Sequence, residues 1–156
     1  MRSYVRIVCS FIACFGAGAL GSIFIDAGVG SWYAALDKPA FTPPAWLFPI
    51  VWFVIYALMS AALAIVWIKD PNAEDMSGWV PMFFAHLLAN IAWIVFFFRL
   101  HVALIAFIDI LLLITAIIIL ICGAWPIDRR ASYLLMPYLA WVSYAAILNL
   151  SIWLMN

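Results

Sequence analysis

The chain of 156 residues is 71% hydrophobic, has a mean hydropathy of +1.21 and contains only 9% charged residues. A water-soluble domain of this length has too small an interior for so much apolar surface, so we expect lipid to be the solvent. The formal net charge is zero, which argues against the basic face that a nucleic-acid-binding protein needs.

Five apolar runs are each long enough to cross a bilayer as a helix. They cover residues 4–25, 45–68, 78–98, 103–124 and 131–154. Each run has roughly 20–24 residues, or about 30–36 Å of helix, which matches the hydrocarbon core of a membrane. The expected fold class is an all-α membrane protein, with residues 1–156 forming a single domain built as a five-transmembrane-helix bundle.

The first run follows Arg2 and Arg6, as a signal peptide would, but it is longer than the apolar region of a signal peptide, so we expect a retained span. Ala13, Ala17 and Gly21 recur every four residues in it. A stripe of small residues lets another helix approach closely. It has two possible uses, packing inside the bundle and dimerisation, of which packing is favoured.

Residues 26–44 are the longest stretch without a continuous apolar pattern. They contain the sequence WYAALDKPAFTPP, from Trp32 to Pro44, with three prolines and an Asp-Lys pair. A connection of this length that carries residues able to fix the backbone is usually functional. We therefore predict that the first loop is ordered and forms a lid over a cavity between the helices.

The second and third runs place polar and aromatic residues on single helix faces. Trp52 and Tyr56 lie four residues apart, and His86, Asn90 and Trp93 also follow helical spacing. For His86 and Asn90, the two main alternatives are contact with a ligand in the cavity and a hydrogen bond between helices. Haem ligation by His86 is disfavoured, because no second histidine lies within a span.

Asp109 interrupts the fourth run. A carboxylate deep in a span costs about 2.5–3.5 kcal/mol on insertion scales, so we expect it to face the bundle or water. A proton relay or a ligand contact is one interpretation. The favoured alternative is an interhelical hydrogen bond or a partly hydrated position.

The fifth run carries polar and aromatic residues on one side, at Tyr138, Trp141, Ala145, Leu148 and Asn149. Polar residues avoid lipid, so a helix face that holds an asparagine points inward, and a tryptophan on that face points inward with it. Trp52, Trp93 and Trp141 lie on three different helices, and an apolar pocket with a few placed polar groups is the usual small-molecule site. We expect these indoles to converge beneath the lid around a flat, apolar ligand.

No conventional catalytic or metal-binding pattern is visible. The sequence has no HExxH motif, no Gly-rich phosphate loop and no Ser-His-Asp spacing. Cys9, Cys14 and Cys122 lie in apolar runs without a CxxC motif, so we expect neither a disulfide nor a metal site.

The basic residues are distributed unequally between the two predicted ends of the bundle. The end with the N-terminus collects Arg2, Arg6, Lys69, Arg129 and Arg130, and the other end has Lys38 and Arg99. This asymmetry predicts a cytoplasmic N-terminus and a lid that faces outward. It assumes a bacterial cell membrane, the favoured location; a bacterial or mitochondrial outer membrane is the alternative.

Five features together resemble the TspO/MBR family, the tryptophan-rich sensory proteins related to the mitochondrial translocator protein, or peripheral benzodiazepine receptor. These features are WYAALDKPAFTPP, Trp52, the segment HLLANIAW, Asp109 and the segment PYLAWVSYAAILN. The resemblance covers nearly the whole chain. It implies five transmembrane helices, a homodimer and a cavity closed by the first loop.

The resemblance also implies a membrane receptor for tetrapyrroles such as protoporphyrin IX and haem, which also accepts isoquinoline-carboxamide or benzodiazepine-type ligands. Alternatives are light-dependent porphyrin degradation, which would make the chain an unconventional enzyme, and transport. No cofactor is required; the partners are a porphyrin, membrane lipid and a second copy. The implied pocket residues are Tyr33, Trp52, Asn90, Trp93, Trp141, Ala145 and Leu148, with His86 and Asp109 as further candidates. Tyr33, Trp52 and Trp141 match residues linked to porphyrin chemistry.

The sequence departs from the family pattern at three places. His86 stands where glutamine is frequent, and Phe41 replaces a frequent tryptophan of the lid. After Asn149 the chain reads LSIWLMN, without a tyrosine followed by lysine or arginine. The sterol-recognition pattern is therefore absent from this end, and we do not expect sterol binding. Such patterns are weak indicators of sterol binding in any case.

Overall fold

The computed structural model describes residues 3–25, 29–70, 72–73 and 78–156. The helices are α1 (Ser3–Ile23), α2 (Val29–Ala35), α3 (Leu47–Lys69), α4 (Trp79–Ile94), α5 (Ala103–Ala124) and α6 (Arg129–Met155), and the π-helical turn η1 (Val95–Arg99) extends α4. Five segments are long and apolar enough to cross a membrane: α1, α3, α4 with η1, α5 and α6. The described residues contain no strand, and the predicted five-helix bundle is confirmed.

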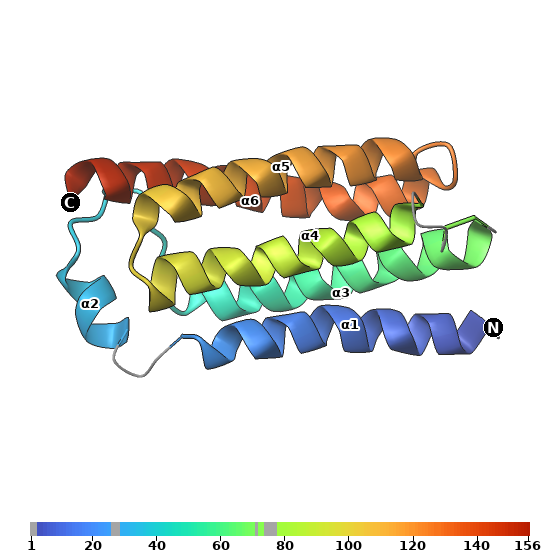
Figure 1. Cartoon of the computed structure of the whole chain (residues 1–156), viewed down its shortest axis with the longest axis horizontal. Helices are drawn as coiled ribbons and strands as arrows, with labels where there is room; N and C mark the ends of the chain where they lie inside the picture. Colours follow the sequence, from blue (N-terminus) through green and yellow to red (C-terminus); the bar gives the residue numbers. More distant parts are fainter. Residues whose placement is uncertain (1–2, 26–28, 71, 74–77) are drawn as a thin grey trace.

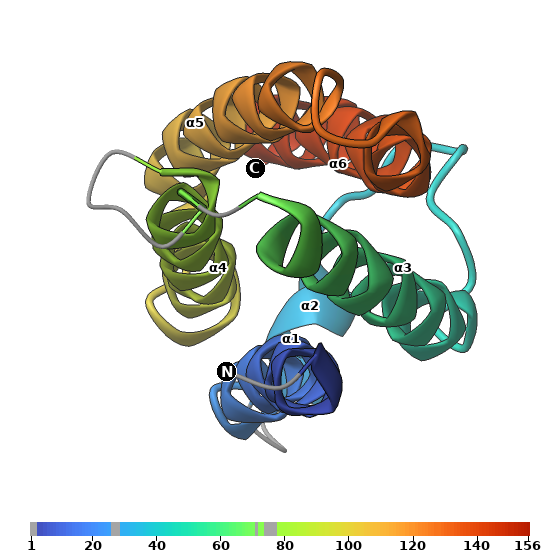
Figure 2. The ribbon, with the colours of Figure 1, turned by 90° about the vertical axis from the view of Figure 1, so that its right-hand side faces the viewer.

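The five long helices lie side by side along the long axis of the molecule, with the two termini at opposite ends (Figure 1). Viewed along the bundle, they form a ring in the order α1, α3, α6, α5, α4, and α4 packs back against α1 (Figure 2). Helices that follow each other in the chain are therefore not always neighbours. This order brings α1, α3, α4 and α6 around a common space.

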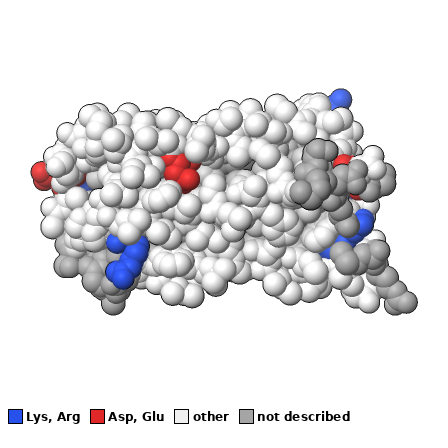
Figure 3. Space-filling model, viewed as in Figure 1, with Lys and Arg blue, Asp and Glu red and all other residues white. Residues whose placement is uncertain are grey.

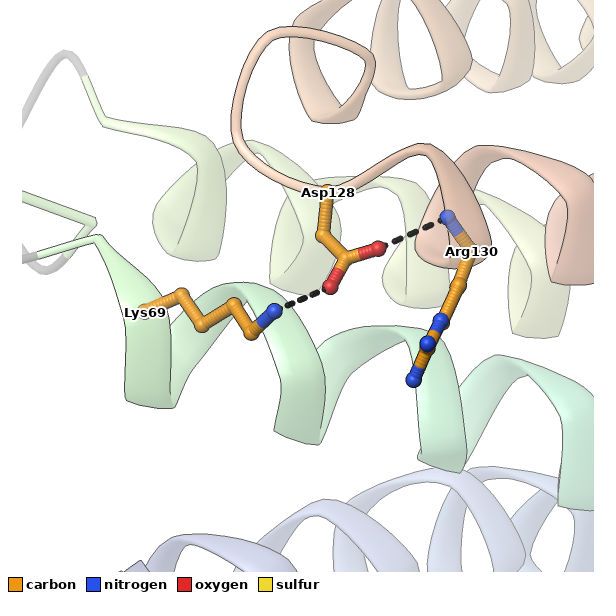
Figure 4. Close-up of polar contacts among 3 residues, drawn as sticks. All are labelled: Lys69, Asp128 and Arg130. Carbon is orange, nitrogen blue, oxygen red and sulfur yellow. Dashed lines mark hydrogen bonds and ion pairs between the residues drawn. The ribbon is translucent and has the colours of Figure 1, made fainter.

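Charged residues gather near the two ends of the face seen in Figure 3, apart from one acidic patch between them. The long white zone between the ends is the surface expected of a membrane-spanning bundle. At the end that holds the N-terminus, Lys69 pairs with Asp128, which also accepts the backbone N–H of Arg130 at the start of α6 (Figure 4). The cytoplasmic assignment of this end stays a prediction.

The small-residue stripe of α1 packs inside the bundle. Ala17 and Gly21 are buried, together with Ser10 and Cys14. A Cβ at Gly21 would lie 2.4 Å from the terminal methyl of Ile94 on α4, so a side chain here would require that methyl group to move. The favoured prediction of internal packing is confirmed.

The lid is ordered across its described residues, and it contains a helix that the sequence did not suggest. Helix α2 lies at the end of the bundle where the C-terminus lies (Figure 1). The Lys38 ammonium donates to the carbonyl oxygens of Tyr33 at 2.6 Å and Leu36 at 2.9 Å. A cation at this position satisfies carbonyls that the end of a helix leaves free. Residues 26–28 of the predicted lid lie outside the described residues.

Candidate functional site

A cavity of about 610 Å³ lies beneath the lid. Its described lining comes from α1, α2, α3, α4 with η1, and α6, and from Ile25 and Ala45 beside them. The lining is almost entirely apolar and includes Phe15, Tyr33, Trp52, Tyr56, Trp93 and Phe97. Its volume lies within the range of about 300–1,000 Å³ that is typical of small-molecule sites.

Among the described residues of the lid helix, Tyr33 lines this cavity. Its ring packs against Phe97 and Phe98, with centroid distances of 6.4 and 6.0 Å, and the Lys38 ammonium lies 4.9 Å from the ring centroid. Burial raises the pKa of the Tyr33 phenol, and nearby Tyr144 raises it further. The hydroxyl therefore stays protonated at neutral pH and presents a hydrogen-bond donor at the lid.

Trp52 of α3 forms part of the cavity wall. Its ring lies against Tyr56 at 5.5 Å and against Tyr138 at 6.3 Å, measured between centroids. These separations are those of interacting aromatic pairs. Among the described residues the indole N–H makes no hydrogen bond, so it is available to a guest in the cavity.

Trp93 is held on the opposite wall by an asparagine of α6. Its indole Nε1 donates to Asn149 Oδ1 at 3.2 Å, and Asn149 Nδ2 donates to the Ala103 carbonyl of α5 at 2.8 Å. The Trp93 ring stacks on Phe97 with an interplanar angle of 16°. The sequence reasoning that an asparagine-bearing face points inward holds for Trp93 and Asn149, which both line the cavity.

Ala145 and Leu148 of α6, which the family resemblance implies as pocket residues, also line the cavity. Trp141 of the same helix does not appear in the lining. It packs against Phe48 at 5.7 Å between centroids, and Phe48 lies in the cavity wall. The structure thus brings Trp52 and Trp93 to one cavity and places Trp141 behind Phe48, one ring away from it.

His86 and Asn90 lie next to the cavity wall rather than in it. Tyr56 donates to Asn90 Oδ1 at 3.0 Å, Asn90 Nδ2 donates to the Tyr138 hydroxyl at 3.1 Å, and that hydroxyl lies 2.9 Å from His86 Nε2. His86 is 2% exposed and Asn90 is 1% exposed. Of the two alternatives for these residues, the structure shows hydrogen bonds between helices, which link α3, α4 and α6.

Asp109 lies on α5, outside the cavity lining. It is buried, and its Oδ2 has no hydrogen-bond partner among the described residues. Of the two favoured alternatives for this carboxylate, an interhelical hydrogen bond or a partly hydrated position, the described part of the chain does not show the hydrogen bond. Its place in the site stays a prediction.

Sequence reasoning missed the contribution of α1. Phe15, Gly18, Ala19 and Ser22 line the cavity, although the small residues of this helix had suggested only packing inside the bundle or dimerisation. A Cβ at Gly18 would lie 2.6 Å from the Tyr56 ring. The close approach of α1 to the cavity wall therefore needs glycine here, and the cluster of small residues was the available signal.

The site does not have the donors of a metal centre. The described residues hold no group of three or more His, Cys, Asp or Glu side chains placed to bind a metal ion. No histidine lies in the described lining, and both nitrogens of His86 are engaged, by the Tyr138 hydroxyl and the Phe83 carbonyl. What the cavity offers a guest is aromatic surface, with a few donors at its edge.

Comparison with known proteins agrees with this architecture. The model of the TspO/MBR family matches residues 10–154. Tryptophan-rich protein TspO of Archaeoglobus fulgidus is 37% identical over 152 residues, or 97% of each chain. Protein CrtK of Rhodobacter capsulatus is 34% identical over 94% of this chain and 89% of its own. Translocator protein of Homo sapiens is 31% identical over 91% of this chain and 82% of its own. The chain therefore belongs to the TspO/MBR family.

Proposed function

We propose that this TspO-type membrane protein is a receptor that binds a porphyrin-type tetrapyrrole in the cavity beneath the lid. The observation that carries the proposal is the lining of that cavity, where Tyr33, Trp52 and Trp93 from three different elements surround one apolar space. Aromatic walls favour a flat, conjugated guest, because stacked and edge-on ring contacts add to the gain from apolar burial.

The polarity of the cavity also suggests how a porphyrin lies in it. None of the described lining residues carries a charge, so burying the carboxylates of a porphyrin deep inside would cost several kcal/mol. The ring would therefore enter first and the carboxylates would stay at the lid, near the free donors of Tyr33 and Trp52. We propose that the same lining also accepts isoquinoline-carboxamide and benzodiazepine-type molecules, because they too are apolar and aromatic.

Titration of the purified protein with protoporphyrin IX, followed by the porphyrin absorption band, tests the proposal. Replacing Trp52 by alanine removes one wall, and we expect a loss of affinity of about 1 kcal/mol or more, or roughly fivefold. Trp125→Ala is the matched control, because Trp125 lies beyond the far end of α5, outside the described lining. Unchanged affinity in Trp52→Ala, or an equal loss in both variants, contradicts the proposal.

Light-dependent porphyrin degradation is a second candidate, because the oxidisable rings of Trp52 and Tyr33 lie in the cavity wall. An indole beside an excited porphyrin can donate an electron, but unspecific bleaching would also consume porphyrin. The distinguishing result is a defined product, formed under light by the unmodified protein and lost in a Trp52→Phe variant that still binds porphyrin. A product that persists in this variant argues against the enzymatic function.

A further inference from the structure

Tyr138 and His86 form a buried pair directly behind the cavity wall. The Tyr138 hydroxyl lies 2.9 Å from His86 Nε2, and the two side chains are 0% and 2% exposed. Tyr138 belongs to α6 and His86 to α4, so the pair spans two helices. Among the described residues, the imidazole is the proton acceptor within reach of this buried phenol.

The surrounding contacts fix the direction of the hydrogen bond between them. The Phe83 carbonyl oxygen lies 3.0 Å from His86 Nδ1 and can only accept, so Nδ1 carries the proton of the neutral imidazole. Nε2 is then the acceptor. On its other side, the Tyr138 oxygen accepts the amide N–H of Asn90 at 3.1 Å, so its own O–H donates to His86.

Tyr138 also contacts the cavity wall. The ring of Trp52, which faces the cavity, lies 6.3 Å from the Tyr138 ring between centroids, in an edge-on arrangement. Two other tyrosines line the cavity, Tyr33 and Tyr56, but neither faces a base in the described structure. Tyr56 donates to the Asn90 amide oxygen, and the Tyr33 hydroxyl has no hydrogen-bond partner among the described residues.

We propose that Tyr138 and His86 act as a redox relay that re-reduces Trp52 after it has lost an electron to a photoexcited porphyrin in the cavity. The relay rests on the proposed function, which supplies the porphyrin as oxidant. The excited porphyrin takes one electron from Trp52 and leaves an indole radical cation. One electron then passes from Tyr138 to Trp52, the phenolic O–H bond breaks, and a new N–H bond forms at His86 Nε2.

The products of this step are a neutral tyrosyl radical, an imidazolium at His86 and a porphyrin reduced by one electron. The imidazolium keeps its Nδ1–H bond to the Phe83 carbonyl. When the reduced porphyrin returns its electron to the tyrosyl radical, the proton moves back from His86 and the cycle closes. The relay would therefore protect Trp52 from irreversible oxidation, because the oxidised site moves from Trp52 to Tyr138, away from the cavity.

The relay depends on a base at position 86. A glutamine at position 86 could still hydrogen-bond to Tyr138 and to the Phe83 carbonyl, but an amide does not take up the phenolic proton. His86→Gln thus keeps the contacts and removes the proton acceptor. Tyr138→Phe removes the electron donor, and Tyr133→Phe is the matched control, because Tyr133 is an exposed tyrosine of the same helix.

The experiment begins with protoporphyrin IX binding to each variant by titration, so that the receptor proposal is judged separately. Porphyrin-loaded protein is then illuminated while it is frozen, and its electron paramagnetic resonance spectrum is recorded. We expect a neutral tyrosyl signal in the unmodified protein and in Tyr133→Phe, and its loss in His86→Gln and Tyr138→Phe. Ring-deuterated tyrosine should narrow the signal, which assigns the radical to a tyrosine side chain even if a variant fails to fold.

The outcomes separate the two proposals. If the unmodified protein binds porphyrin and yields no tyrosyl signal, or if His86→Gln retains the full signal, the relay is wrong and the receptor function stands. If deuterated tyrosine leaves the light-induced signal unchanged, the radical lies elsewhere and the relay is also wrong. If the unmodified protein does not bind porphyrin, the receptor function is contradicted and the relay loses its oxidant.

Discussion

The side-chain amide of Asn156 pairs with the backbone of Asp37. The Asp37 N–H donates to Asn156 Oδ1 and Asn156 Nδ2 donates to the Asp37 carbonyl, both at 3.0 Å. Asn156 caps α6, and Asp37 follows the lid helix closely. The pair therefore joins the lid to α6, one of the helices that form the cavity wall.

Loss of this pair should loosen the lid without changing the cavity wall. We expect Asn156→Ala to weaken protoporphyrin IX binding by about 1 kcal/mol, since both partners are exposed and each hydrogen bond adds little net free energy. The loss should appear as faster dissociation, measured by stopped-flow displacement of bound porphyrin. Ser151→Ala is the control, because the Ser151 hydroxyl bonds within α6 to the Ile147 carbonyl. Equal dissociation rates in both variants would show that the pair does not hold the lid.

The five long helices were predictable because lipid imposes one requirement on every span, an apolar run of sufficient length. The fourth run was predicted at 103–124, and α5 covers Ala103–Ala124. Helix α2 was missed for a physical reason. It has seven residues, too few to show a helical period, and a side chain just beyond its end, that of Lys38, satisfies carbonyls at that end.

The candidate site was predictable only in part. Trp93 was found because Asn90 marks the inward face of its helix, and it lines the cavity as expected. Trp141 shares a helix with Asn149 but is shielded by Phe48, because α3 packs against α6 and places this ring between them. Which side chain fills such a contact depends on the pairing of helices, and single-helix periodicity does not contain that information.

Gly18 should be intolerant of a side chain. A Cβ there would lie 2.6 Å from the Tyr56 ring, which cannot swing away freely because its hydroxyl is bonded to Asn90. We expect Gly18→Ala to destabilise the protein by about 1–3 kcal/mol, as overpacking in a core does, and to lower porphyrin affinity. Gly16→Ala on the same helix is the control, since a Cβ there meets nothing within 4 Å. In thermal unfolding in detergent, Gly18→Ala should have a lower melting temperature than Gly16→Ala. Equal melting temperatures would contradict the close packing at Gly18.

Asp128 should make stability depend on pH in the acid range. The hydrogen bond from Lys69 and then the backbone N–H of Arg130 lower the pKa of its carboxyl. Because the folded-state pKa lies below the unfolded value of about 3.9, the stabilisation is fully present above that value and is lost as the pH falls through the folded pKa. Asp128→Asn keeps a helix-capping side chain but should make the stability of the protein depend less on pH in the acid range. Asp70→Asn, whose carboxylate accepts the Asn72 backbone N–H, serves as the control.

The Asp109 carboxylate should lower the stability of the protein. Its Oδ2 is buried without a hydrogen-bond partner among the described residues, and a carboxylate within a span costs about 2.5–3.5 kcal/mol on insertion scales. If nothing offsets that cost, Asp109→Asn should raise stability by about 1–3 kcal/mol, because an amide of the same shape is easier to bury.

Thermal unfolding of Asp109→Asn at neutral pH, compared with Asp37→Asn, measures this effect. Asp37 is exposed, and its described hydrogen bonds use the backbone, so its substitution should leave the melting temperature unchanged. A higher melting temperature for Asp109→Asn with unaltered porphyrin binding would show that the carboxylate contributes neither to the stability of the fold nor to binding in the cavity. A lower melting temperature for Asp109→Asn would mean that the carboxylate is stabilised in the membrane. An unpaired charge within a span cannot otherwise favour the folded state.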